Sequence, residues 1–191
     1  NGYDDAWITE ATEKRGLLNL RTTPDAIPEI LKKKNVDMLT SHKVFSEVEL
    51  KSRYEIMLEN YCKTVMIEAC TMVDMAKKQI LPAVSAYTTD LAESVGKKLK
   101  LGTDIACKYE KEAVKKLSIL CDEIAEATDL LEGTLVKIKA AESIGEESEM
   151  IRDAVLVAMS ELRVACDEAE TMTAEKYWPF PTYGELLFGV R

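Results

Sequence analysis

The feature that most constrains this chain is a series of three long segments in which apolar residues recur at helical spacing. Within each segment they are three or four positions apart, the period of an α-helix that buries one face. The first stripe is Tyr54, Leu58, Tyr61, Val65, Ala69, Met72, Ala76, Ile80 and Ala83; the second is Ile105, Tyr109, Ala113, Leu117, Leu120, Ile124, Ala127, Leu131, Leu135 and Ile138; the third is Ile151, Val155, Ala158, Leu162, Ala165, Ala169 and Met172. Strand signals are nearly absent. The sequence therefore predicts an all-α protein.

Capping and helix-breaking residues mark the ends of these segments. Ser46 followed by Glu49 predicts a capping box at the start of the first helix. Pro82 lies inside this helix and predicts a kink, because proline cannot donate a backbone hydrogen bond. Gly102 is expected to end it.

The second helix is expected from about Thr103 to Ala141, and the third after a short link at residues 143–145. Long helices joined by short links must run antiparallel. We therefore expect an elongated antiparallel three-helix bundle over residues 44–176.

Residues 1–43 contain shorter helical signals and form the first of three predicted segments. A helix is expected from Asp4 to Lys14, ending at Gly16. Residues 22–25 are expected to make a turn, and a short helix should then run from Pro28 to Lys34.

The C-terminal residues 177–191 form an unusual tail rich in aromatic residues and proline. The two prolines at 179 and 181 favour an extended chain, and Thr182 with Glu185 is expected to cap a last short helical turn. Burial of each large aromatic side chain is worth about 2–3 kcal/mol. Either the tail packs on its own bundle, or it docks on a neighbouring domain or subunit. The residues proposed for docking are Trp178, Phe180, Tyr183 and Phe188.

Net charge and cysteine usage limit the partners and the compartment. Residues 1–43 carry seven acids and seven bases, so the whole excess of 34 acids over 25 bases lies in residues 44–191. An acidic body repels nucleic acid and anionic lipid, so neither is expected as a partner. We find no signal peptide and no apolar run of about 20 residues, and we expect a cytoplasmic protein. The five cysteines form no CxxC pair and are expected to be buried free thiols: Cys62, Cys70, Cys107, Cys121 and Cys166.

The sequence offers no set of residues for catalysis, cofactor binding or metal binding. His42 is the single histidine, and Leu39 stands where a di-iron bundle would need a glutamate, so His42 is expected in a loop or cap. No phosphate-binding glycine loop occurs. Four methionines gather on the first long helix, where core packing is preferred over a soft docking surface: Met57, Met66, Met72 and Met75.

Four segments carry a resemblance to a known family. They are RGLLNLRTTPDAIP (15–28), SEVELKSRYE (46–55), DMAKKQILPAV (74–84) and YWPFPTYGELLF (177–188). Together these segments resemble the C-terminal helical part of type III glutamine synthetases. The resemblance implies a parent enzyme, a glutamate–ammonia ligase, that uses ATP and Mg²⁺ or Mn²⁺, forms γ-glutamyl phosphate and assembles as stacked rings. It places the catalytic core upstream of Asn1, so we interpret the chain as cut from a longer protein and carry over no catalytic residue.

These observations leave three hypotheses. The first is a non-catalytic structural domain that contacts its own catalytic core and neighbouring subunits of a homo-oligomer. The second is a regulatory module of the same enzyme that binds a metabolite or a protein. The third is a free-standing helical adapter unrelated to synthetases.

Overall fold

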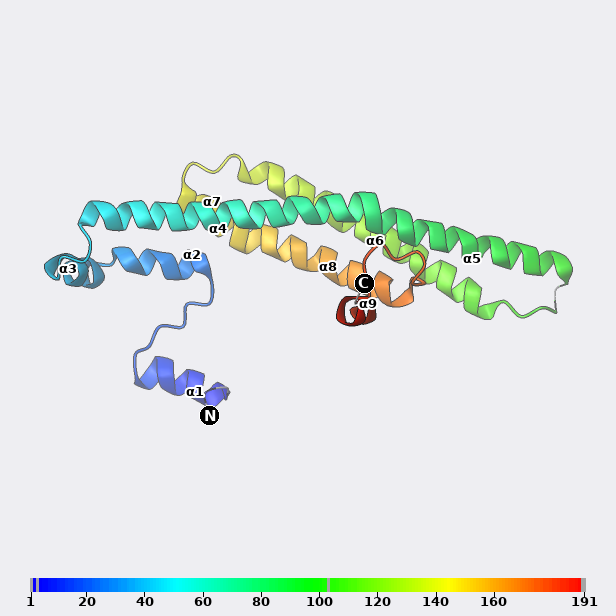
Figure 1. Cartoon of the computed structure of the whole chain (residues 1–191), viewed down its shortest axis with the longest axis horizontal. Coiled ribbons are helices and arrows are strands. Elements are labelled where there is room, and N and C mark those ends of the chain that lie inside the picture. Colours follow the sequence, from blue (N-terminus) through cyan, green and yellow to red (C-terminus); the bar gives the residue numbers. More distant parts are fainter. Residues whose placement is uncertain (1, 3, 103, 190–191) are drawn as a thin grey trace. The chain divides into compact units, whose positions relative to one another are not determined.

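The computed structural model describes residue 2, residues 4–102 and residues 104–189, and all regular structure in this part of the chain is helical (Figure 1). This confirms the predicted all-α class. In chain order the elements are α1 (Asp5–Thr9), η1 (Glu10–Lys14), α2 (Thr23–Ala26), η2 (Ile27–Leu31), α3 (Lys33–Ser41), α4 (Glu47–Met75), η3 (Ala76–Ile80), α5 (Leu81–Leu101), α6 (Lys108–Ile138), α7 (Ile144–Met150), η4 (Ile151–Val155), α8 (Leu156–Met172) and α9 (Tyr183–Phe188). Of the η elements, η2 is a 3-10 helix and the other three are π-helical turns.

The chain divides into two compact units. The first comprises Asn1–Thr64 and Ala141–Arg152, and the second comprises Val65–Ala140 and Asp153–Arg191. In the first unit α2 packs near α7, and Arg152 pairs with Asp25 at 2.6 Å. In the second unit α6 packs against both α5 and α8.

The N-terminal segment agrees with the sequence in one helix and differs in two places. Asp4 caps α1, the helical turns end at Lys14, and Gly16 adopts φ +65°, as the predicted helix requires. The predicted turn at residues 22–25 is wrong, because the Thr22 side chain caps α2 and Pro24 occupies an early helical position.

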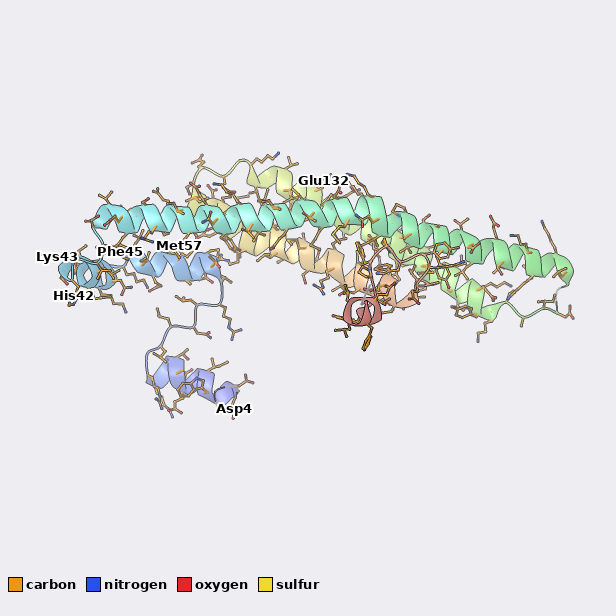
Figure 2. The ribbon with its side chains drawn as sticks, viewed as in Figure 1. Asp4, His42, Lys43, Phe45, Met57 and Glu132 are labelled. Atoms are coloured by element: carbon orange, nitrogen blue, oxygen red, sulfur yellow. The ribbon has the colours of Figure 1, made fainter. Side chains whose placement is uncertain are left out.

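The short helix expected to end at Lys34 is also different in the structure. The 3-10 turn η2 ends at Leu31, and a separate helix, α3, continues to Ser41. His42 is the C-cap residue of α3, and its backbone N–H donates to carbonyl oxygens of that helix. His42 and Lys43 lie at the turn before α4 (Figure 2), so the expected cap position of this histidine is confirmed.

The start of α4 follows the predicted capping box. The backbone N–H of Ser46 donates to Glu49 Oε2 at 2.7 Å, and the N–H of Glu49 donates to Ser46 Oγ at 3.3 Å. Within four residues Leu50 is fully buried. The first long helix therefore begins where two local hydrogen bonds satisfy its free N–H groups.

The interruption predicted at Pro82 takes the form of a π-helical turn. The N–H of Leu81 donates to the carbonyl of Ala76, and Pro82 sits in the first turn of α5 that follows. The wider turn η3 accommodates the missing proline N–H, and Figure 1 shows the helix axis changing direction there. Another π-helical turn, η4, has no comparable signal in the sequence.

The second stripe is largely confirmed as the buried face of α6. The helix begins at Lys108 and not near residue 103, Tyr109 is 68% exposed, and Thr128 is buried in place of Ala127. The Thr128 hydroxyl donates to the carbonyl of Ile124 at 2.6 Å, which satisfies the polar atom inside the core. The buried residues are Ala113, Leu117, Leu120, Ile124, Thr128, Leu131, Leu135 and Ile138.

Candidate functional site

The predicted docking tail begins with Tyr177, which attaches it to α5 within the second unit. Beyond α8 a tight turn forms, in which the N–H of Tyr177 donates to the carbonyl of Ala174 at 2.8 Å. The Tyr177 hydroxyl then donates to Asp90 Oδ2 on α5 at 2.5 Å. Lys176 Nζ lies 3.5 Å from the same carboxylate oxygen. The hydrogen bond from Tyr177, followed by the charge of Lys176, lowers the pKa of Asp90.

Two further tyrosines complete this attachment. The rings of Tyr87 and Tyr177 have centroids 5.2 Å apart at an angle of 42°. Burial, and then a hydrogen bond with Tyr109, raises the pKa of Tyr87. Tyr177 and Asp90 were not among the docking residues predicted from the sequence, because no local pattern links residues so far apart in the chain.

The first two predicted docking residues lie against each other. Trp178 and Phe180 make an edge-to-face contact, with ring centroids 6.0 Å apart and an interplanar angle of 75°. Both side chains are half-buried. Together with Pro179, Pro181 and Glu185 they line a shallow hollow on the surface of the tail.

The other two predicted docking residues are exposed on α9. The predicted capping box forms, since the N–H of Thr182 donates to Glu185 Oε2 at 2.7 Å and the N–H of Glu185 donates to Thr182 Oγ1 at 3.3 Å. Tyr183 is 84% exposed and Phe188 is 81% exposed. Leu186 at 66% and Leu187 at 71% add to the same apolar surface. The structure thus attaches the beginning of the tail and leaves its end uncovered within the described chain.

A second apolar surface lies in the second unit, between the end of α4 and α8. It is a groove of about 400 Å³. Its apolar lining comes from Met72, Met75, Ile80, Leu156, Met159 and Leu162. The expected core packing of the methionines is wrong for Met57, which is 46% exposed. Met66, Met72 and Met75 are half-buried.

The cysteines are free thiols with different surroundings. Cys62, Cys107 and Cys166 are buried as expected, whereas Cys121 is half-buried and Cys70 is exposed. Burial raises the pKa of the Cys62 and Cys166 thiols to about 11. The expectation of burial is wrong for Cys70, because this residue follows the buried Ala69 and falls on the outer face of α4.

Among the described residues, no group of three or more His, Cys, Asp or Glu side chains is placed to hold a metal ion. No helix in the described part of the chain has the length and apolar character needed to cross a bilayer.

These features define a class: an all-helical domain with an apolar tail attached at one end and uncovered at the other. The chain belongs to the glutamine synthetase C-terminal domain family, whose sequence model matches residues 1–99. The tail lies beyond that match, but relatives extend the similarity over the whole chain.

Three curated relatives carry the same family name. A glutamine synthetase of Butyrivibrio fibrisolvens is 38% identical over 100% of this chain and 27% of its own length. A type-3 glutamine synthetase of Dictyostelium discoideum is 32% identical over 98% of this chain and 26% of its own length. A glutamine synthetase of Bacteroides fragilis (strain YCH46) is 28% identical over 98% of this chain and 26% of its own length. The chain thus spans about a quarter of the length of these relatives.

The comparisons confirm the resemblance of the chain to type III glutamine synthetases. An adapter unrelated to synthetases is therefore wrong as a hypothesis.

Proposed function

We propose that this chain is the non-catalytic C-terminal structural and assembly domain of a cytoplasmic type III glutamine synthetase. The observation that carries the proposal is the exposed apolar end of the tail, in a chain that spans only 27% of a relative. Large apolar side chains on a short helix gain free energy when a partner surface removes them from water.

The proposed architecture has three parts. Residues 44–176 form an elongated antiparallel three-helix bundle, residues 1–43 join it to the catalytic core, and residues 177–191 form the docking tail. Contacts of α6 with both α5 and α8 support the bundle.

The proposed parent enzyme joins ammonia to glutamate with ATP and Mg²⁺ or Mn²⁺. The described residues do not fit the metal, because their acids, cysteines and single histidine form no group of three. We therefore assign the nucleotide and the metal to the part of the parent enzyme outside this chain. Purified residues 1–191 should form no glutamine from glutamate, ammonia and ATP, and measurable product would contradict a non-catalytic domain.

The proposed partner of the tail is the enzyme's own catalytic core or a neighbouring subunit of a homo-oligomer. The side chains of Tyr183 and Phe188 pack little against the rest of this chain, since both are more than 80% exposed. Their replacement should therefore affect assembly and leave the fold of the chain intact.

The test is the double variant Tyr183→Ser with Phe188→Ser in the full-length protein. We expect a smaller mean oligomer in analytical ultracentrifugation, with unchanged helical content by circular dichroism. The matched control is Ile67→Ser, which also alters an apolar side chain that is 68% exposed. Equal oligomer size for the tail variant and the control would overturn docking.

A regulatory binding module is the second candidate, and the methionine-lined groove favours it. Flexible thioether side chains adapt to apolar ligands or helices of different shape. Met159→Glu would place a charge in the groove. An unchanged response of the full-length variant to metabolites that report nitrogen status would remove this candidate.

A further inference from the structure

The face of α6 opposite its buried stripe carries an ordered set of charges, which we name the charge stripe. Successive members are three or four residues apart, so they share one side of the helix. All of them are exposed. The charge stripe comprises Lys108, Lys111, Lys115, Ile119, Asp122, Glu126 and Asp129.

The two signs of charge are separated along the charge stripe. The three lysines occupy its N-terminal half, the three acids occupy its C-terminal half, and Ile119, 50% exposed, lies between them. The charges are symmetric about the midpoint between Ser118 and Ile119. For each lysine before this midpoint there is an acid at the same number of residues after it. At about 1.5 Å per residue the whole set extends over about 30 Å of helix.

This order of charges does not stabilise an isolated helix. Like charges three or four residues apart repel each other, and Lys108 and Lys111 stand at the positive end of the helix dipole. Within the described residues, Lys108, Lys111, Lys115, Asp122 and Glu126 make no ion pair, and Asp129 lies 3.9 Å from Lys77. Five of the six charges are thus available to a partner, and Asp129 shares Lys77 with Glu132, which lies closer to it at 2.6 Å.

We propose that two copies of this chain pair through the charge stripe, antiparallel, around a two-fold axis close to Ile119. Reversing the direction of the second helix places the lysine half of each copy against the acidic half of the other. Lys108 then faces Asp129, Lys111 faces Glu126 and Lys115 faces Asp122, and each pair occurs twice.

Because one half of the charge stripe is basic and the other half is acidic, the partner that fits it is a second copy of this chain. A polyanion would match the lysines and be repelled by the acids, and a polycation would have the reverse difficulty. One exposed helix face is a small contact, so it acts beside other interfaces and sets their register. The inference extends the proposed assembly role but depends only on α6, so loss of tail docking would leave it intact.

The test is disulfide crosslinking in the full-length protein, in a Cys70→Ser background that removes the exposed thiol. Ile119→Cys places two thiols near the axis, and we expect a covalent dimer under mild oxidation. The control is Val136→Cys, 65% exposed on the same helix. Its two copies would be about 50 Å apart along antiparallel helices, so it should not crosslink to itself.

Charge reversal tests the pairing itself. We expect Lys111→Glu with Lys115→Glu to slow the crosslink at position 119 at least tenfold, and Asp122→Lys with Glu126→Lys to do the same. Co-expression of the two variants should restore it. One stripe is then acidic except for Lys108 and the other is basic except for Asp129, so every facing pair has opposite charges. Controls with the same changes in net charge are Lys14→Glu with Lys34→Glu, and Glu68→Lys with Glu170→Lys, which should crosslink like the parent.

Two results would overturn the proposal. One is a crosslink through Ile119→Cys no faster than through Val136→Cys. The other is a co-expressed pair that crosslinks no better than either charge variant alone. Neither result depends on Tyr183 or Phe188. A failure of pairing through the charge stripe can therefore be distinguished from a failure of tail docking.

Discussion

The hydroxyl of Tyr177 donates a hydrogen bond of 2.5 Å to the carboxylate of Asp90, a residue 87 positions earlier in the chain. This contact joins the first residue of the tail to α5 within the second unit. Beyond it the aromatic side chains become more exposed: Trp178 and Phe180 are half-buried, whereas Tyr183 and Phe188 are more than 80% exposed and available to a partner.

Removing this hydrogen bond should have a pH-dependent effect. We expect Tyr177→Phe to lower the melting temperature at pH 7 by about 2 °C. Since Tyr177 lowers the folded-state pKa of Asp90 below its ordinary value of about 3.9, the stabilisation is present above that value and is lost as pH falls through the folded pKa. Thermal melts from pH 7 to pH 3 should show the two proteins converging. Tyr183→Phe, a residue 84% exposed, is the control and should melt like the parent at every pH.

The buried stripe of α6 should be sensitive to truncation. Leu117 is fully buried on the helix that packs against both α5 and α8. We expect Leu117→Ala to lower the free energy of unfolding by about 2–5 kcal/mol, from lost apolar burial and the cavity left behind. Urea unfolding followed by circular dichroism measures this loss. Val136→Ala, on the exposed side of the same helix, should change it by no more than about 0.5 kcal/mol.

The capping box at the start of α4 should contribute measurably to stability. We expect Ser46→Ala to cost about 1 kcal/mol, because the N–H of Glu49 loses its side-chain acceptor. Hydrogen bonds from Ser46, first from its backbone, lower the pKa of Glu49. The Glu49 part of the stabilisation is therefore present above the ordinary pKa of about 4.3 and is lost as pH falls through the lowered folded value. Urea unfolding at pH 7 and pH 3 should show a larger difference from the parent at pH 7; Ser41→Ala, outside the box, serves as control.

The thiols should react at very different rates. Cys70 is exposed, whereas burial raises the pKa of Cys62 and Cys166 to about 11, which leaves almost no thiolate near neutral pH. We expect iodoacetamide at pH 7.5 to modify Cys70 first in the native protein. Cys62 and Cys166 should react only after denaturation. Mass spectrometry of the peptides checks this, and fast modification of Cys166 in the native state would contradict the structure.

Local signals predicted much of the fold. The capping boxes at Ser46 and Thr182 form because each involves residues only three positions apart. The stripe on α6 is buried nearly as predicted because helical spacing alone places those side chains on one face.

Other features could not be predicted in this way. The π-helical turn η4 has no distinctive residue in the sequence, and within it Ile151 and Val155 are both fully buried. For the candidate site, the sequence identified the aromatic residues and the last helical turn but not which of them would be covered.

The sequence by itself determined which segments form the long helices and which face of each is apolar, because periodicity, caps and prolines act over a few residues. Only the tertiary structure decided which helices those faces meet, that Tyr177 is held by Asp90, and that Tyr183 and Phe188 remain exposed. Burial depends on residues far apart in the chain, and no local pattern contains that information.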